Sequence, residues 1–181
     1  MHDPFLVSLA SGEPVPPAVR HLHSGSGAYV GRCRIERGER GVISLLLRLG
    51  GFPAASEDAP VSLEVVSQEK NWIWERKFGT HLTRSQLTYD PSLDCVRERI
   101  GALSIWLKPV MLGEKLSIEI LRLHVLGVPC PRFLLPRSNT VEWQDDEGRF
   151  RFDVSADVPG LGMLIRYQGW LSPVHAELVD V

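Results

Sequence analysis

The chain has 181 residues, of which 44% are hydrophobic and 23% are charged. It is therefore long enough to bury a substantial core and too apolar for a disordered chain. Its 20 Lys and Arg residues nearly balance 22 Asp and Glu residues, giving a net charge of −2. This balance lacks the basic excess that nucleic-acid binding requires. We expect a single globular domain spanning residues 1–181, with no nucleic-acid partner.

The cysteines and the apolar segments predict the cellular compartment. Cys33, Cys95 and Cys130 are far apart and form no C-x-x-C motif. This pattern favours buried, reduced thiols over a disulfide framework or a thiolate zinc site. The apolar stretch at residues 5–10 is too short for a signal peptide, and no segment approaches the ~18 apolar residues of a membrane span. We expect a cytoplasmic protein without a membrane span.

The first third of the chain predicts two short helices and one strand. Residues 16–23 begin with two prolines, which suit the first helical turn. Residues 28–36 alternate in polarity as a strand does. Residues 41–49 are apolar on nearly every side, and a Gly-Gly-Phe-Pro sequence follows them, so we expect a short buried helix. The small polar segment 54–60 is expected to be a loop.

From residue 61 onward the sequence predicts a strand every eight to twelve residues, which is typical of an all-β fold. The expected strands are 61–69, 71–78, 81–89, 93–99, 102–109, 115–126, 139–145, 149–156 and 161–171. The acidic turn at residues 145–148 predicts a hairpin between the strands on either side of it. Three prolines within residues 127–138 exclude a central strand there.

These elements predict a mainly β fold. We expect a curved antiparallel sheet or an up-and-down, lipocalin-like barrel of about nine or ten strands, with one or two short helices. The alternative is an α+β fold in which the helix near residues 41–50 packs on an open sheet.

One strand carries a cation on its apolar face. Side chains alternate along a strand, so Arg76 lies on the same side as Trp74 and the other aromatic residues of segment 72–79. A buried guanidinium needs a partner. Glu98 lies on the inward face of its own strand and is the natural candidate. The pair is either a structural ion pair, with Arg76 also free to lie on a tryptophan ring, or an anchor for a polar group of a ligand.

Two more cationic or titratable side chains follow the same alternation. Arg122 and His124 share the face of Ile118 and Ile120 in the strand 115–126. If this face is internal along its whole length, both residues join Arg76 and Glu98. Otherwise the strand extends past the core, and both side chains are solvated.

Cofactor motifs are weak in this sequence. His21 and His23 share a face in an extended segment, but two histidines alone do not specify a metal site. The glycines of segment 25–31 precede a strand, which is the reverse of the order in a dinucleotide-binding loop. We therefore predict no metal and no cofactor.

Several short motifs occur together in a fixed order over residues 15–173. They are Val19-Arg20-x-Leu22-His23, Trp74-x-Arg76-x-Phe78-Gly79, Glu98-Arg99-Ile100-Gly101, Gly127-Val128-Pro129-x-Pro131, Leu135-Pro136, Phe150-x-Phe152-Asp153-Val154 and Tyr167-x-Gly169-Trp170-Leu171. With this set the chain resembles the bacterial family of domain of unknown function 4166. The resemblance implies no particular activity. It implies a possible oxidoreductase partner, because family members occur alone or joined to oxidoreductase-like domains, and it draws attention to Arg76, Glu98 and His23.

Three functions are compatible with these observations. The first is a module that binds a small, largely apolar or carboxylate-bearing ligand in a β-barrel cavity. Its candidate ligand-binding residues are Arg76, Glu98, Trp74, Arg122, His124 and His23. The second is an enzyme in which His23 or His124 acts with Glu98 in acid–base chemistry. The third is an interaction domain with a packed, ligand-free interior.

Overall fold

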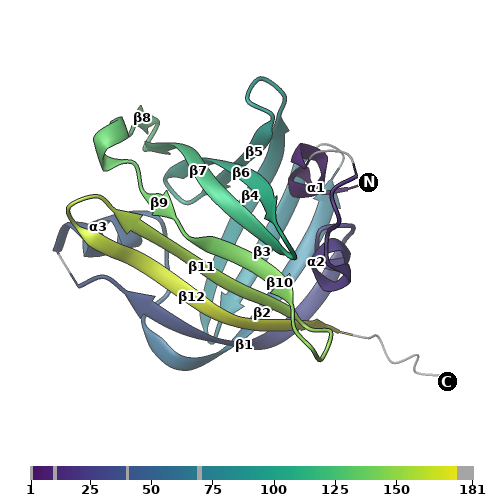
Figure 1. Ribbon diagram of the computed structural model, residues 1–181. Coiled ribbons are helices and arrows are strands. Elements are labelled where there is room, and N and C mark those ends of the chain that lie inside the picture. The colour runs from purple at the N-terminus through teal and green to yellow at the C-terminus, as the bar shows by residue number, and fades with distance from the viewer. Residues whose placement is uncertain (1, 10–11, 40, 69–70, 175–181) are drawn as a thin grey trace.

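The computed structural model describes residues 2–9, 12–39, 41–68 and 71–174 (Figure 1). Within these residues, ten long antiparallel strands follow one another around a closed barrel. They are β1 (Gly27–Arg37), β2 (Ser56–Gln68), β3 (Asn71–Phe78), β4 (His81–Asp90), β5 (Cys95–Ile100), β6 (Leu103–Leu112), β7 (Lys115–Val125), β10 (Thr140–Gln144), β11 (Phe150–Val158) and β12 (Gly162–Pro173). The predicted β-barrel is confirmed, and closure excludes the open-sheet alternative.

The barrel is closed by two pairings between strands that are not consecutive in the sequence. β12 pairs with β1, so that the last strand meets the first. β10 pairs with β7 at only three positions, from Thr140 opposite Ile118 to Glu142 opposite Leu116. All other pairs of neighbouring strands among the ten barrel strands follow one another along the chain. They include the predicted hairpin of β10 and β11 across residues 145–148.

The proline-rich segment lies outside the barrel order. It contains only two two-residue strands, β8 (Val128–Pro129) and β9 (Arg137–Ser138), and the 3-10 helix η1 (Arg132–Leu134). β8 pairs with β7, and β9 pairs with β11. The prediction that this segment holds no central strand is confirmed.

Three α-helices lie at the two ends of the barrel. α2 (Pro17–Leu22) precedes β1, whereas α3 (Gly41–Leu49) follows it, so the two helices lie at opposite ends of that strand (Figure 1). α1 (Pro4–Ser8) contacts β4, β5 and β6 at the α2 end. Its first turn is capped by Asp3, whose Oδ1 accepts hydrogen bonds from the backbone N–H groups of Phe5 and Leu6. α2 and α3 match the two predicted helices, but α3 is not buried on every side as predicted, because only one of its faces packs on the barrel: Ile43 and Leu47 are buried, whereas Val42 and Leu45 are exposed. α1 was not predicted.

The segment 54–60 is not the predicted loop. β2 begins at Ser56 because its first residues extend the pairing with β1. Arg32 on β1 supports this extension by donating two hydrogen bonds to the carboxylate of Asp58, at 2.6 Å each. The pattern of hydrophobic residues could not predict this extension, because the ion pair that supports it is exposed and polar.

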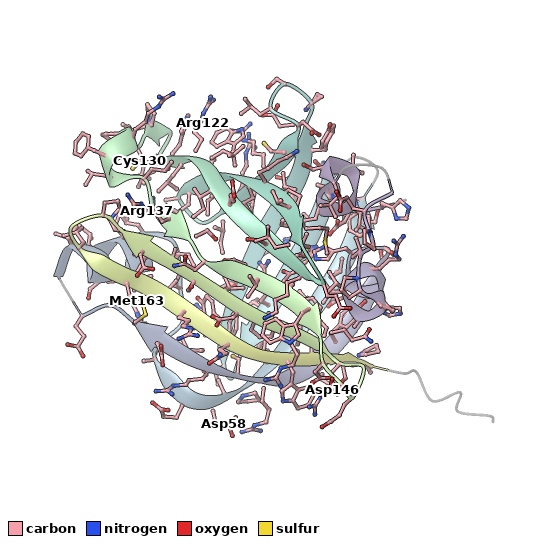
Figure 2. The ribbon with its side chains drawn as sticks, in the orientation of Figure 1. Asp58, Arg122, Cys130, Arg137, Asp146 and Met163 are labelled. Carbon is pink, nitrogen blue, oxygen red and sulfur yellow. The ribbon has the colours of Figure 1, made fainter. Side chains whose placement is uncertain are left out.

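The cysteines are free and differ in burial. Cys33 and Cys95 are buried as predicted, but Cys130 is only partly buried, because it lies in the proline-rich segment outside the barrel (Figure 2). Burial, together with the nearby Asp58 carboxylate, raises the pKa of Cys33 to about 11, so this thiol stays protonated at neutral pH.

The closely packed pair β1–β12 yields a stability prediction. A Cβ atom added to Gly31 would overlap the carbonyl oxygen of Trp170, whereas one added to Gly25 meets open space. We expect Gly31→Ala to lower the free energy of unfolding by about 2 kcal/mol or more, because backbone atoms must move to relieve the overlap. Gly25→Ala should change it by less than about 1 kcal/mol. Urea denaturation measures both, and equal effects would contradict this account.

Candidate functional site

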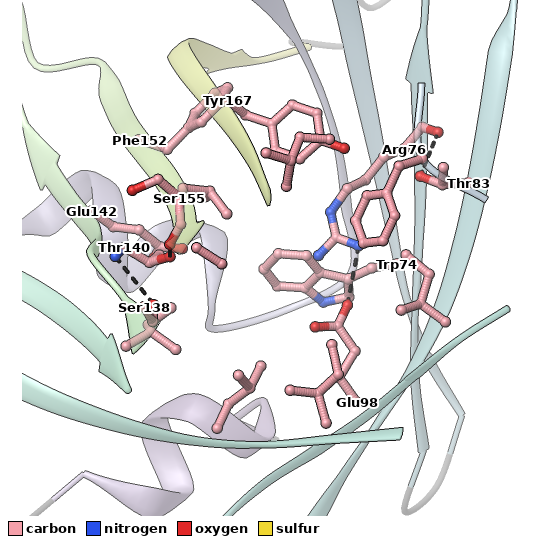
Figure 3. Close-up of a pocket in the computed structure, with 18 of the residues that line it drawn as sticks. Trp74, Arg76, Thr83, Glu98, Ser138, Thr140, Glu142, Phe152, Ser155 and Tyr167 are labelled. Atoms are coloured by element: carbon pink, nitrogen blue, oxygen red, sulfur yellow. Dashed lines mark hydrogen bonds and ion pairs between the residues drawn. The ribbon is translucent and has the colours of Figure 1, made fainter. Parts of the chain in front are cut away.

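The barrel encloses a cavity of about 240 Å³ (Figure 3). Phe5 and Leu22 line it at the end of α1 and α2, and Phe52 lines it near the end of α3. Most of its wall is apolar. The polar or titratable side chains on the wall are Arg76, Thr83, Glu98, Ser138, Thr140, Glu142, Ser155 and Tyr167. The interior is therefore a largely apolar chamber with a few polar groups.

The predicted inward ion pair lies on one side of this chamber. Arg76 Nη1 donates hydrogen bonds to Ser85 Oγ at 2.9 Å and to Glu98 Oε1 at 3.3 Å. The guanidinium carbon lies 4.9 Å from the centre of the Trp74 ring, within range of a cation–π interaction. Alternation along β3 and β5 brings these residues together, as the sequence predicts.

Hydrogen bonds within the protein use only some of the side-chain N–H donors of Arg76. All its side-chain hydrogen bonds to described residues involve Nη1, although a guanidinium carries five N–H donors. The side chain is 24% exposed and that of Glu98 is 13% exposed, although both line an internal chamber. The donors at Nε and Nη2 therefore remain available to a molecule in the cavity.

Tyr167 adds a neutral polar group to the wall. Its ring stacks on that of Phe78, with the ring centres 5.1 Å apart. Burial raises the pKa of Tyr167 above its ordinary value, so the hydroxyl stays protonated and can donate or accept a hydrogen bond. The sequence contained no signal for this role, because Tyr167 occupies an ordinary inward position of its strand.

On the side of the chamber away from Arg76 in Figure 3, short polar side chains surround the start of β10. The Thr140 backbone N–H donates to Ser138 Oγ at 3.2 Å, and the Thr140 hydroxyl donates to the Ser155 carbonyl at 3.5 Å. Glu142 follows on the same strand and faces the same chamber.

His23 forms a buried ion triad with two carboxylates. Its Nδ1 lies 2.5 Å from Asp3 Oδ2, and its Nε2 lies 2.8 Å from Glu142 Oε2. Burial alone lowers the pKa of His23, but the charges and hydrogen bonds of Asp3 and Glu142 outweigh it and raise the pKa to about 10. His23 is therefore an imidazolium at neutral pH. It ties the N-terminal segment to the barrel wall.

The sequence identified His23 as a candidate but missed both of its partners. Asp3 had a local signal, since an aspartate directly before a proline is typical of a helix start. Glu142 lies 119 residues from His23, and only the closed barrel brings the two together.

Of the two alternatives for Arg122 and His124, the structure does not support the inward cluster, because neither side chain lines the cavity and Arg122 is exposed. A β-bulge at Leu121 reverses the alternation of β7, since Trp106 pairs with Arg122 but the next residue, Leu107, pairs with Ile120. Leu123 consequently lines the cavity. Arg122 and His124 instead contact Trp106, at 5.4 Å from the guanidinium carbon to the ring centre and 4.8 Å between ring centres.

The two neighbouring histidines do not converge on one point. His21 is exposed, and its Nδ1 lies 3.1 Å from the hydroxyl of Tyr29. Both ring nitrogens of His23 are occupied by carboxylates. The side chains that were considered as a metal pair therefore serve two separate contacts.

The cavity adjoins a surface hollow at the seam between β7 and β9. Beyond Ile118, β7 no longer pairs with β10, and the short strand β9 pairs with β11 instead. Ile120, Pro136 and Ser138 line both the cavity and this hollow. We refer to these three residues as the seam opening, since they line both the chamber and the hollow at the surface.

Residues 15–171 match the family model described as Domain of unknown function (DUF4166). No curated protein matches the chain.

The ion triad predicts how stability varies with pH. Because folding raises the pKa of His23 from 6.5 to about 10, protonation stabilises the folded state. This contribution is complete below about pH 6.5 and disappears as the pH rises through about 10. We expect His23→Gln to lower the free energy of unfolding by about 3–5 kcal/mol at pH 6. The deficit should shrink steadily towards pH 10.

Urea denaturation over this pH range measures the deficit, with His21→Gln as the matched control. His21 is exposed, so its variant should show only a small and nearly constant difference from the wild type. A deficit of His23→Gln that is unchanged between pH 6 and pH 10 would show that the imidazolium is not the stabilising form.

Proposed function

Because the chain belongs to the family described as Domain of unknown function (DUF4166), we propose its function from the geometry of its cavity. The proposal is that the barrel binds one small, largely apolar molecule whose polar end accepts a hydrogen bond from Arg76. The observation that carries it is an internal apolar chamber in which one guanidinium has unused donors.

The size of the chamber supports this proposal. An apolar cavity of about 150 Å³ is enough to hold benzene, and this one measures about 240 Å³. Empty apolar space lowers stability by about 24 cal/mol per Å³, so a cavity of this size forgoes roughly 6 kcal/mol. That amount is comparable with the whole stability of a typical domain. Because an empty chamber of this size lowers the stability so much, it favours a binding role over a purely structural one.

The polar groups indicate the end group of the ligand. Arg76 offers donors, while the carboxylates of Glu98 and Glu142 already accept from Arg76 and His23. Tyr167 adds a neutral hydroxyl. An alcohol, carbonyl or carboxylate can accept from Arg76, whereas an ammonium group would face a like charge. We therefore expect a hydrogen-bond acceptor at the polar end.

The other two functions have less support in the geometry. Acid–base catalysis with Glu98 needs a histidine beside it, but His23 is bound by two other carboxylates and His124 lies against Trp106. An interaction domain with a packed interior does not fit a chamber of about 240 Å³.

A series of eight-carbon probes tests the end-group preference. We expect octanol and octanoate to bind at least about 10-fold more tightly than octylamine, as one charge-assisted hydrogen bond is worth more than about 1.4 kcal/mol. Isothermal titration calorimetry measures the three affinities. Native mass spectrometry of the purified protein would detect any ligand that is already bound.

The variant Arg76→Met should remove this preference without abolishing binding of the apolar tail. A double variant, Arg76→Met with Glu98→Met, replaces both charges and guards against simple misfolding. Arg84→Met is the matched control, because Arg84 is exposed and pairs with Glu75 outside the barrel. Failure of all three probes to bind the wild type would reject the proposal, as would an unchanged preference in Arg76→Met.

Filling the chamber provides an independent prediction. Ala156 lines the cavity and is only partly buried. We expect Ala156→Phe to lower octanol affinity by at least about 10-fold, since the new ring takes the space of the ligand. The same variant should leave the melting temperature unchanged or raise it. Unaltered octanol binding in a folded Ala156→Phe protein would place the binding site elsewhere.

A further inference from the structure

The most exposed apolar side chains of the described residues gather in one segment. Phe133, Leu126 and Val128 are 75%, 70% and 66% exposed, and no other large hydrophobic side chain among the described residues exceeds them. Leu126 lies in the turn between β7 and β8, Val128 begins β8, and Phe133 lies in η1. This corner projects from the barrel at the upper left of Figure 1.

A second exposed apolar face adjoins this segment. Val42, Leu45 and Leu49 recur at helical spacing along α3, and they are 58%, 56% and 36% exposed. Hydrogen bonds connect the two regions through the β5–β6 turn. Ala102 N–H donates to the Leu49 carbonyl at 3.3 Å, and Leu126 N–H donates to the Ala102 carbonyl at 2.8 Å. We call these six side chains the apolar rim; they are Val42, Leu45, Leu49, Leu126, Val128 and Phe133.

The segment that carries Leu126, Val128 and Phe133 has charges of one predominant sign. Residues 120–141 contain three arginines and no acidic residue, although the whole chain has a net charge of −2. Two of these arginines, Arg132 and Arg137, are exposed and line the surface hollow beside Phe133. Glu119 is the one acidic side chain in that lining. An apolar surface bordered by arginines is complementary to an anionic, partly apolar partner.

The rim also borders the surface hollow that adjoins the cavity. The hollow that contains Phe133 shares Ile120, Pro136 and Ser138 with the chamber. A surface in contact with the rim would therefore face the seam opening. No helix in the described part of the chain is both long and apolar enough to cross a bilayer.

We propose that the apolar rim docks on the surface of an anionic lipid bilayer. Leu126, Val128 and Phe133 insert among the headgroups, while Arg132 and Arg137 contact lipid phosphates. Projecting side chains on a hairpin turn and a short helix suit insertion into a deformable surface better than a match to a rigid protein groove. If the proposed function also holds, docking places the seam opening where an apolar ligand is most concentrated.

Co-sedimentation with vesicles tests the docking. The wild type should sediment with vesicles of phosphatidylcholine mixed with phosphatidylglycerol, and bind at least about 10-fold more weakly to phosphatidylcholine alone. Leu126→Ser with Phe133→Ser should lower binding to the anionic vesicles by about 10-fold or more. Arg132→Gln with Arg137→Gln should remove most of the preference for anionic vesicles.

The matched control is Leu112→Ser with Val30→Ser. These side chains are 61% and 49% exposed but lie on strands near the α1 and α2 end of the barrel. The control should bind as the wild type does. The docking is overturned if the wild type does not sediment with anionic vesicles, if the rim variant binds as well as the control, or if the rim instead mediates self-association.

Binding of octanol without vesicles separates this proposal from the function of the cavity. The rim variant should retain its octanol affinity, since Leu126 and Phe133 do not line the chamber. Loss of vesicle binding with intact octanol binding therefore supports docking at the rim. Vesicle binding by a wild type that binds no probe would reject only the cavity function.

Discussion

The three-position pairing of β10 with β7 is the constraint on which the rest of the structure depends. It closes the sheet into a barrel and thereby encloses the chamber. It also ends at Ile118, so the remainder of β7 faces the short strand β9 across the seam instead of a long partner. A longer β10 would seal the wall, and a missing one would leave two unpaired edges. The short pairing of β10 with β7 therefore both encloses the chamber and leaves the seam beside β9.

The same pairing places Glu142 where it can hold the N-terminal segment. Glu142 is the last residue of β10 in this ladder, and its carboxylate accepts from His23. His23 in turn contacts Asp3, which caps α1. Removing either carboxylate would leave one N–H donor of the buried imidazolium without its acceptor, which lowers the stability of the folded state. The helices that close this end of the chamber are therefore coupled electrostatically to the closure of the barrel.

The sequence predicts features that depend on the alternation of side chains within one strand. It misses contacts that form only when the barrel closes. Arg76 and Glu98 were found because each lies on the apolar face of its own strand, and a two-residue period is enough to show this. The bulge at Leu121 has a local signal that was overlooked, since the apolar positions change phase there, from Ile118 and Ile120 to Leu121 and Leu123. Glu142 was missed for another reason. Its partner lies 119 residues away, and no pattern within one strand reports such a contact.

The bulge in β7 determines the charge of the chamber. With an unbroken alternation, Arg122 and His124 would face inward and add one or two positive charges beside Arg76. The inserted residue turns both outward onto Trp106 and brings Leu123 inward. The charges at the wall are then Arg76 with Glu98, and Glu142 with His23 behind it. Each of these cations has a carboxylate beside it, and the triad of Asp3, His23 and Glu142 keeps one net negative charge, so no strong positive field fills the chamber. Such an interior suits an apolar molecule with one polar end better than a multiply charged one.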